Sequence, residues 1–210
     1  MTPSTQTIAS TSLSELQLMV DVTFPIISGK VIPADHGYAL LSSITRYIPS
    51  IKEHTDISIL TASGLRDGTG KIVLAEYSRF LFRLPVSKIP LVYSLAGETL
   101  KLGIHAIRLG IPSINPLKVC SKLRSRIVTI KGYDQPDAFL EAVRRQLEGL
   151  TIRGEVSLPH NARKTIKIKR FSVVGFTVEV RNLSEEDSLK LQAYGLGGKR
   201  HMGCGIFLPF

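Results

Sequence analysis

The chain has 210 residues, 43% of them hydrophobic and 21% charged, which is enough for one ordinary domain or two small ones with real cores. No run of eighteen apolar residues occurs, so the sequence predicts no membrane-spanning helix and no membrane partner. Two cysteines, Cys120 and Cys204, are too few for a disulfide framework or a zinc site on their own. This usage fits a reducing cytoplasm, so we expect a cytoplasmic protein.

The net charge of +10 is concentrated in the middle of the chain. Residues 1–117 contain ten basic and eight acidic side chains, residues 118–170 contain thirteen and five, and residues 171–210 contain four of each. Such a basic middle favours a polyanionic partner, and the alternative is a merely solvated basic surface. A membrane-surface role is disfavoured because the basic residues follow strand patterns and not one amphipathic helix.

The first half of the chain predicts one βαββαβ unit over residues 16–110, preceded by a flexible polar tail over 1–15. Asp35 is expected to cap a helix over 37–48 that Pro49 ends. The other expected elements are strands over 16–24, 57–61, 71–76, 79–84 and 99–108, a hairpin tip over 65–70, and a helix over 86–95. Two prolines within 111–116 predict a linker, which we assign to 111–124.

The second half repeats this order over residues 125–210. Pro136 begins the most regular helix, and Ser184 caps the last one, with Asp187 at the capping-box position. The expected elements are strands over 125–131, 152–158, 165–171, 173–180 and 202–208, and helices over 136–150 and 184–194. The repeated order predicts an α+β fold of two tandem ferredoxin-like domains.

Glycines are dense near the end of the chain, at positions 195, 197, 198, 203 and 205, with basic residues between them. Glycine turns at positive φ and lets backbone N–H groups approach a ligand, and the cations Lys199 and Arg200 favour a phosphate. An ordinary glycine-rich turn is the alternative. The order helix, glycines, strand is the reverse of a P-loop or a dinucleotide fingerprint, and it excludes both.

The spacing Gly-x-Gly-x5-Gly-x-Gly, with basic residues inside it and a terminal apolar strand after it, resembles the glycine-rich loop of the RAMP superfamily of CRISPR-associated RNA-binding proteins. Together with DHGYALLSSITRYIP at 35–49, the stretch GLGGKRHMGCGIFLPF at 195–210 is similar to the endoribonucleases that cut CRISPR precursor RNA within its repeats, near the MYXAN subtype. The resemblance covers residues 16–210. It implies two ferredoxin-like domains, CRISPR repeat RNA as partner, and cleavage without metal that leaves a 2′,3′-cyclic phosphate.

Metal-free RNA cleavage needs a base for the ribose 2′-hydroxyl and an acid for the departing 5′ oxygen, and histidine suits both roles near neutral pH. The resemblance implies a catalytic histidine on or just after the first helix and a tyrosine near its start. His54 and Tyr38 occupy these positions, and His36 is a second fit that the sequence does not rank against His54. The alternative is that His36 bonds the helix entry and that His54 is simply exposed. His105 is expected to be structural and His160 to lie in a turn.

A basic strand over residues 163–171 (RKTIKIKRF) alternates apolar and cationic side chains and forms a candidate ladder for a phosphate backbone. The expected RNA contacts are Arg163, Lys164, Lys167, Lys169, Arg170, Gly195, Gly197, Gly198, Lys199, Arg200, His201, Gly203 and Gly205. No HExxH, CxxC or acidic triad is present, so we expect no metal site and no cofactor.

Two functions follow from these features. The first is a metal-independent endoribonuclease that matures CRISPR guide RNA. The second is a non-catalytic RAMP-type subunit that binds guide RNA, with the other subunits of an effector complex as its partners. Products made in the presence of EDTA would separate the two.

Overall fold

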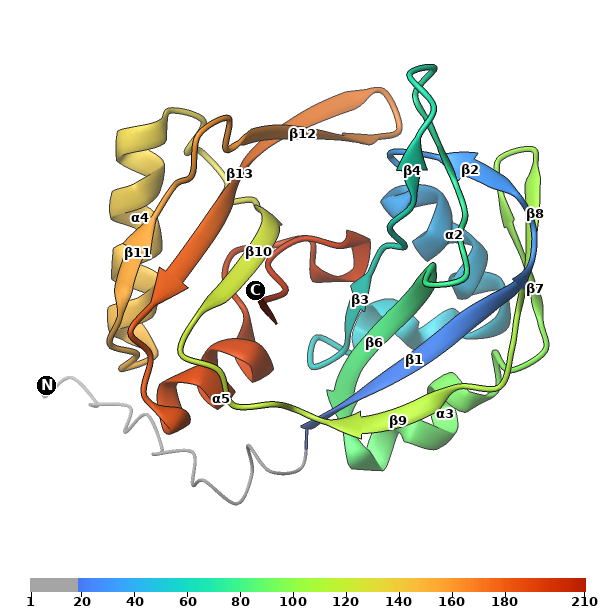
Figure 1. Ribbon diagram of the computed structural model, residues 1–210, viewed down its shortest axis with the longest axis horizontal. Coiled ribbons are helices and arrows are strands. Elements are labelled where there is room, and N and C mark those ends of the chain that lie inside the picture. Colours follow the sequence, from blue (N-terminus) through green and yellow to red (C-terminus); the bar gives the residue numbers. More distant parts are fainter. Residues whose placement is uncertain (1–18) are drawn as a thin grey trace, which may run out of the picture.

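The computed structural model describes residues 19–210, which form two lobes joined by one extended segment (Figure 1). The predicted tail over 1–15 and the first three residues of the first predicted strand lie outside the described residues. Both lobes combine a β-sheet with helices, so the expected α+β class is confirmed. Within residues 19–210, no helix has the length and apolar composition needed to cross a membrane.

The N-terminal lobe is built on a sheet with the strand order β3-β6-β1-β8-β7, and a further strand, β9, pairs with β1. Its strands are β1 (Met19–Ser28), β3 (Ser58–Leu60), β6 (Arg79–Pro85), β7 (Thr99–Leu102), β8 (His105–Leu109) and β9 (Ser113–Pro116). Its helices are α2 (Gly37–Tyr47), α3 (Ile89–Tyr93) and the short 3₁₀ turns η1 (Pro49–Glu53) and η2 (Val86–Lys88). A small second sheet has the order β2-β5-β4, formed by β2 (Val31–Pro33), β4 (Leu65–Arg66) and β5 (Lys71–Val73).

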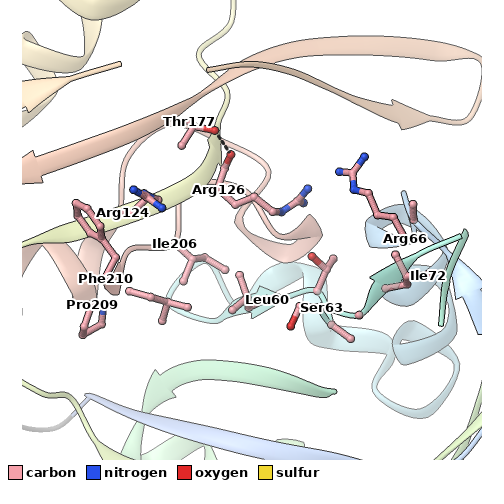
Figure 2. A pocket seen from close by; sticks show the side chains of 15 residues that line it. Leu60, Ser63, Arg66, Ile72, Arg124, Arg126, Thr177, Ile206, Pro209 and Phe210 are labelled. Carbon is pink, nitrogen blue, oxygen red and sulfur yellow. Dashed lines mark hydrogen bonds between the residues drawn. The ribbon is translucent and has the colours of Figure 1, made fainter. Parts of the chain in front are cut away.

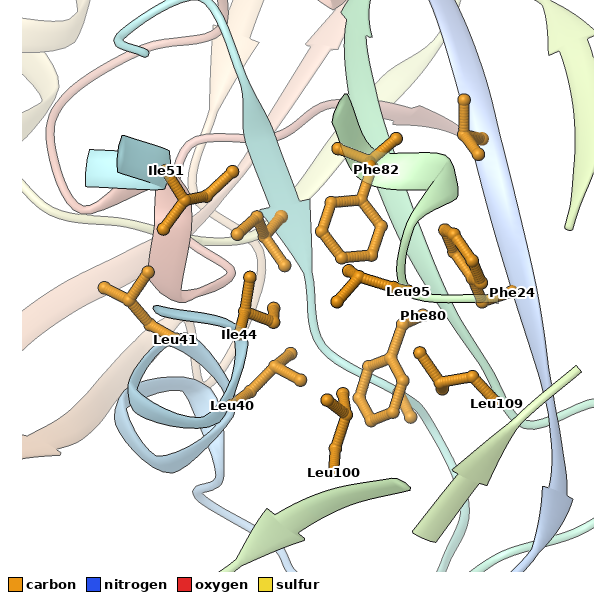
Figure 3. Close-up of a cluster of buried hydrophobic side chains, with 14 of the residues drawn as sticks. Phe24, Leu40, Leu41, Ile44, Ile51, Phe80, Phe82, Leu95, Leu100 and Leu109 are labelled. Atoms are coloured by element: carbon orange, nitrogen blue, oxygen red, sulfur yellow. The ribbon is translucent and has the colours of Figure 1, made fainter. Parts of the chain in front are cut away.

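The core of this lobe follows from the period-two pattern of its strands. Val22 and Phe24 on β1 are fully buried and stand opposite Phe82 and Phe80 on β6, where the rings of Phe24 and Phe82 meet edge to face. Apolar side chains at helical spacing on α2 pack against the same cluster (Figure 3). Burying each of these side chains contributes about 1.5–3 kcal/mol, which fixes α2 against the sheet.

The C-terminal lobe has the strand order β11-β13-β10-β14, and β12 pairs with β13. Its elements are β10 (Leu123–Val128), α4 (Pro136–Gly149), β11 (Glu155–Ser157), β12 (Arg163–Ile168), β13 (Phe171–Arg181), α5 (Glu185–Tyr194), η3 (Arg200–Met202) and β14 (Leu208–Pro209). The expected cap is confirmed: Ser184 Oγ accepts a hydrogen bond from the Asp187 N–H at 3.1 Å. Pro136 begins α4, as predicted.

Several predicted elements are wrong in detail. The single strand expected over 99–108 is two strands, β7 and β8, because Gly103 turns the chain at φ +67°. The strand expected over 202–208 is reduced to Leu208–Pro209, because Gly203 and Gly205 take left-handed φ values of +84° and +69°. The predicted linker includes β9, whose residues pair with Val20–Thr23 of β1. The helix expected over 86–95 divides into η2 and a short α3.

The β12–β13 hairpin reaches from the C-terminal lobe to the N-terminal lobe (Figure 1). There the Asp35 carboxylate accepts a hydrogen bond from the backbone N–H of Lys167 at 2.5 Å. Asp35 is therefore not the helix cap that the sequence predicted. The N-cap position of α2 is His36, and its side chain makes no capping bond.

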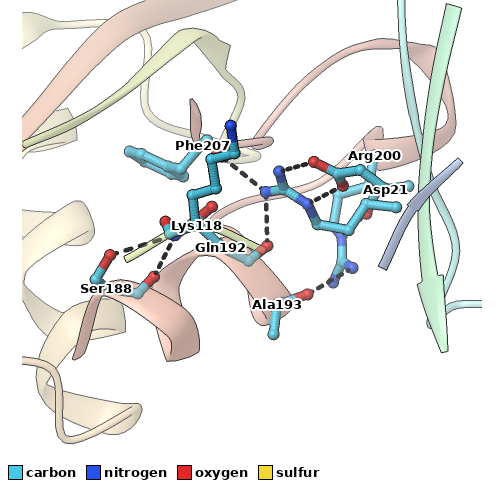
Figure 4. Close-up of polar contacts among 9 residues, drawn as sticks. Asp21, Lys118, Ser188, Gln192, Ala193, Arg200 and Phe207 are labelled. Atoms are coloured by element: carbon cyan, nitrogen blue, oxygen red, sulfur yellow. Dashed lines mark hydrogen bonds and ion pairs between the residues drawn. The ribbon is translucent and has the colours of Figure 1, made fainter. Parts of the chain in front are cut away.

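A buried arginine of the N-terminal lobe also joins the two lobes. Arg83 of β6 is 1% exposed and holds the Asp21 carboxylate with two hydrogen bonds of 2.7 and 2.8 Å. Its remaining terminal nitrogen donates to the carbonyl oxygens of Phe207, at 2.7 Å, and Gln192, at 3.1 Å, both in the C-terminal lobe (Figure 4). The hairpin and Arg83 together position the glycine-rich loop against α2.

Candidate active site

A cleft of about 650 Å³ lies between α2 and the glycine-rich loop, residues 195–205, and we call it the α2 cleft. The hairpin tip and the segment after α2 complete its walls. Its polar lining residues are Tyr38, Ser42, Lys52, Thr55, Lys169, Lys199, Arg200 and His201. Three lysines from three separate segments therefore face one cleft, an arrangement that attracts an anion such as phosphate.

Gly37 lets the loop approach the start of α2. A Cβ atom at this position would collide with the carbonyl oxygen of Met202 in the loop. The side chain of Tyr38, the next residue, lies on the wall of the cleft because α2 and the loop are this close. No special role was predicted for Gly37 from the sequence, although it lies within the N-terminal stretch that carried the resemblance.

Four of the five glycines of the loop bond their backbone N–H groups within the protein, and their expected contact with RNA stays a prediction. The N–H groups of Gly195, Gly197, Gly198 and Gly205 donate to Leu191 O, Gln146 Oε1, Thr129 O and Ile127 O, respectively, at distances of 2.8 to 3.0 Å. Gly203 packs against Thr61. Because these N–H groups are satisfied internally, the ligand-facing charge of the cleft comes from side chains.

Two of the lysines that line the cleft have unusual backbones. Lys169, at the tip of the β12–β13 hairpin, has φ +56°, and Lys199, in the glycine-rich loop, has φ +63°. Residues with a Cβ adopt this region at a cost of about 1–3 kcal/mol, and such strained positions cluster at functional sites. Lys169 was predicted to continue the strand, but it lies in the turn that follows β12.

His201 is held in a defined orientation within the α2 cleft. Its Nε2 lies 2.9 Å from the carbonyl oxygen of His54. Burial lowers the pKa of His201, and the nearby positive charge of Arg200 lowers it further, while the bond to the His54 carbonyl acts in the opposite direction. The sequence predicted His201 as an RNA contact, and the structure shows that it lines the same cleft as Tyr38 and Lys52.

The two histidines that the sequence proposed as catalytic are not among the residues that line the α2 cleft. His36 is 1% exposed: its Nδ1 lies 2.8 Å from Pro33 O, and its Nε2 accepts from the Ala62 N–H at 3.1 Å. Burial lowers the pKa of His36, so its environment is that of a neutral core histidine. The ring of His54 is not among the groups lining the cleft, and its Nδ1 lies 3.1 Å from Lys88 Nζ.

The predicted basic ladder is partly engaged within the protein. Arg163 donates to Asp134 O at 3.0 Å, and Lys164 donates to Asn161 O at 2.9 Å. Arg170 lies over the ring of the next residue at the exposed hairpin tip. Lys167 is exposed on β12, so among these cations the hairpin offers mainly Lys167, Lys169 and Arg170 to an external partner.

Arg200 is a structural residue of the loop. Its guanidinium donates to Ser58 Oγ at 2.8 Å and to Tyr194 O at 2.6 Å, so it ties the loop to β3 and to the end of α5. These internal bonds occupy most of its donors. Its expected contact with RNA stays a prediction, and its positive charge acts on the neighbouring His201.

A second cleft, of about 580 Å³, lies between the lobes, and we call it the inter-lobe cleft (Figure 2). Arg66 of β4 and Arg124 and Arg126 of β10 line it. Arg124 pairs with Glu179 and stacks over Phe210, whereas Arg126 is exposed and has no ion-pair partner among residues 19–210. None of these arginines was predicted from the sequence, although the alternation of arginine with buried residues along β10 was a usable signal for Arg124 and Arg126.

Within the described residues, no group of three or more histidine, cysteine, aspartate and glutamate side chains is placed to hold a metal ion. Cys204 is buried among apolar side chains, and burial raises its pKa to about 11, so it is an unreactive thiol at neutral pH. The ionisable side chains that line the α2 cleft belong to tyrosine, lysine, arginine and histidine.

The model of the Cas6 CRISPR family matches residues 20–210. The chain belongs to the Cas6 family. A curated relative, the CRISPR-associated endonuclease Cas6 of Myxococcus xanthus strain DK1622, is 34% identical over 194 residues, which is 92% of this chain and 83% of the relative. The resemblance to CRISPR-associated repeat-cleaving proteins that the sequence indicated is thereby confirmed.

Solved structures resemble the fold at low sequence identity. One, described as CRISPR associated protein Cas6, has a TM-score of 0.63 at 12% identity and covers 91% of this chain and 98% of that one. Another, of a Cas6-related gene product from Pyrococcus furiosus, has a TM-score of 0.57 at 15% identity, with 91% and 97% covered. At these identities the likeness to Cas6 structures shows the fold alone.

Proposed function

We propose that this chain is an endoribonuclease that cuts CRISPR precursor RNA within its repeats and produces mature guide RNA. The observation that carries the proposal is the α2 cleft, where one imidazole, one phenol and three lysines gather between the two lobes. The 34% identical relative is named an endonuclease, which supports the same activity. The reaction is attack of the ribose 2′-hydroxyl on the adjacent phosphate without a metal ion, giving a 2′,3′-cyclic phosphate and a 5′-hydroxyl.

The residues of the cleft suit this reaction. Lys52, Lys169 and Lys199 stabilise the negative charge that develops on the phosphate oxygens in the transition state. Tyr38 and Lys52 are the donors from which the leaving 5′ oxygen takes a proton. His54 supports the site through its carbonyl oxygen, and its ring remains a candidate for the catalytic role that the sequence assigned to it.

The fold proposal is that each lobe is a ferredoxin-like unit, so that the two stand in tandem. The orders β3-β6-β1-β8 and β11-β13-β10-β14 support it, because each places the second, third, first and fourth strands of a βαββαβ unit side by side. We keep residues 16–110 and 125–210 as the proposed domains, with 111–124 between them. The strand β9 gives part of that connection a structural role.

The proposed partner is CRISPR repeat RNA, held along the cationic surfaces that lead to the α2 cleft. One of these surfaces carries the exposed cations of the β12–β13 hairpin, and the other carries Arg66 and Arg126 of the inter-lobe cleft. Phosphate contacts of this kind position RNA without reading its sequence. The other subunits of a CRISPR effector complex are proposed as further partners, on the resemblance alone.

The deciding experiment incubates the protein with repeat RNA from its own genome in EDTA and maps both product ends. We expect cleavage at one position, with a 2′,3′-cyclic phosphate on one product and a 5′-hydroxyl on the other. A substrate with a 2′-deoxyribose at that position should bind and remain intact. Protein that binds the repeat but never cuts it would support the non-catalytic subunit, and a strict Mg²⁺ requirement with 3′-hydroxyl products would refute the mechanism.

A further inference from the structure

We propose that His201, carried by the glycine-rich loop of the C-terminal lobe, is the general base that takes the proton from the attacking 2′-hydroxyl. This inference rests on the proposed endoribonuclease function and assigns one catalytic role within it. Tyr38 and Lys52, the acid candidates, belong to the N-terminal lobe. The base and the acid would therefore come from different lobes, and the site would be complete only when both lobes are in place.

The hydrogen bond of His201 fixes its tautomer. A carbonyl oxygen can only accept, so the bond of 2.9 Å to His54 O requires the proton to be on Nε2 of His201. In the neutral ring the lone pair is then on Nδ1. No group among residues 19–210 is hydrogen-bonded to this Nδ1, so it is free to accept a proton from a bound ribose.

His54 has the opposite arrangement. The Lys88 ammonium can only donate, so its contact of 3.1 Å occupies the lone pair on Nδ1 of His54. The second nitrogen of the neutral His54 ring then carries the proton. While this contact holds, His54 has no free lone pair for a base, whereas His201 has one on Nδ1. The His54 ring could act as the base only after the Lys88 contact opened.

The charges around His201 favour its neutral form. The adjacent Arg200 and the imidazole of His54 lower the pKa of the ring, whereas the carboxylate of Asp56 has the smaller, opposite effect. Lys52, Lys169 and Lys199 face the same cleft, and their positive charges oppose a further one. Burial acts in the same direction and lowers the pKa of His201, which keeps the ring able to accept a proton at neutral pH.

The proton and bond changes balance within the cleft. The proton of the 2′-hydroxyl passes to Nδ1 of His201 while the 2′ oxygen forms its bond to phosphorus. The bond between phosphorus and the 5′ oxygen breaks, and that oxygen takes a proton from Tyr38 or Lys52. The His201 imidazolium formed in this step keeps its Nε2–H bond to the His54 carbonyl, which stabilises the new charge.

The test uses His201→Gln in single-turnover cleavage of the repeat RNA. The glutamine amide N–H₂ can replace Nε2–H at the His54 carbonyl, but the side chain supplies no basic lone pair. We expect a rate loss of about 10²–10⁴ with RNA affinity within a few-fold of wild type. In the wild type, the cleavage rate should rise with pH through a midpoint below the ordinary histidine pKa of about 6.5. In the variant, the rate should no longer rise with pH over this range.

Two controls separate a proton-transfer role from a structural one. His160→Gln changes an exposed turn histidine and should cut at the wild-type rate. His201→Ala should be partly rescued by added imidazole, which a structural role would not allow. Suppose that the wild type cuts the repeat, and that His201→Gln cuts it at a rate within threefold of the wild-type rate with the same rise at acidic pH. The assignment of the base is then wrong and the proposed function stands. If the wild type never cuts the repeat, the assignment of the base and the proposed function are both wrong.

Discussion

The Arg83 guanidinium donates to the carbonyl oxygen of Phe207 at 2.7 Å, a bond that joins residues 124 positions apart and in different lobes. The same side chain neutralises Asp21, which is 16% exposed. Arg83→Met should lower the free energy of unfolding by about 3–5 kcal/mol, because it leaves the Asp21 charge in the interface without a partner. Urea unfolding followed by circular dichroism measures this loss.

The double variant Asp21→Asn with Arg83→Met is the control for that prediction. It removes both charges, so it should be less destabilised than Arg83→Met alone. A double variant that is as unstable as the single one would mean that the carbonyl contacts of Arg83, and not the buried ion pair, dominate its contribution.

The glycines of the loop should differ sharply in their tolerance of a side chain. Gly205 has φ +69°, and a Cβ there would collide with Leu196 O, whereas Gly198 has no such φ and only Thr129 O at 4.0 Å from its Cβ position. Gly205→Ala should therefore lower the melting temperature far more than Gly198→Ala. Thermal unfolding of the two variants compares them directly, and equal effects would contradict the packing role that we assign to Gly205.

Lys199→Gly should weaken RNA binding without lowering the stability of the fold. Glycine relieves the left-handed backbone at φ +63° but removes the charge from the α2 cleft. We expect an unchanged or higher melting temperature, weaker RNA binding, and a log–log salt slope reduced by about 0.7 for a single-stranded contact. Lys101→Ala, an exposed lysine on β7, is the matched control and should leave the slope unchanged. An unaltered slope in Lys199→Gly would remove Lys199 from the RNA contacts.

Acid should destabilise the fold through His36. Burial lowers the folded pKa of this histidine below its unfolded value, so its stabilising contribution is complete above about pH 6.5 and is lost as the pH falls toward the folded pKa. Between pH 7 and 5 the unfolded state binds more protons at this position. His36→Gln should be less stable at pH 7 but lose less stability between pH 7 and 5 than wild type. An equal loss in both proteins would contradict the neutral core assignment.

The sequence predicted those features that depend only on residues close together in the chain. The cap at Ser184 and the proline at the start of α4 are confirmed because they act within one turn of a helix. The extent of the last strand was wrong because the apolar run over 202–208 gave no indication that glycines 203 and 205 turn left-handed. Likewise, nothing marks the turn at Lys169, where strand-like alternation continues into a left-handed residue.

The site depended on contacts that no local pattern encodes. Tyr38 was predicted from the resemblance and lies in the α2 cleft. Lys52 and Lys88 were missed because a lysine in a short turn carries no functional signal by itself. His201 was assigned to RNA contact only, since its orientation depends on a carbonyl 147 positions away in the chain. His36 lay in the motif, but its burial became visible only in the structure.

The pairing of β9 with β1 affects how the lobes can be produced separately. A fragment that ends at Gly110 would lose Ser113–Pro116 and leave the N–H and C=O groups of Val20–Thr23 unpaired along an open sheet edge. Open edges of this kind recruit strands from other molecules, so such a fragment should form aggregates. Extending it through Pro116 restores the missing ladder. A fragment intended to fold as the N-terminal lobe alone should therefore end after Pro116, because β9 completes the sheet of that lobe.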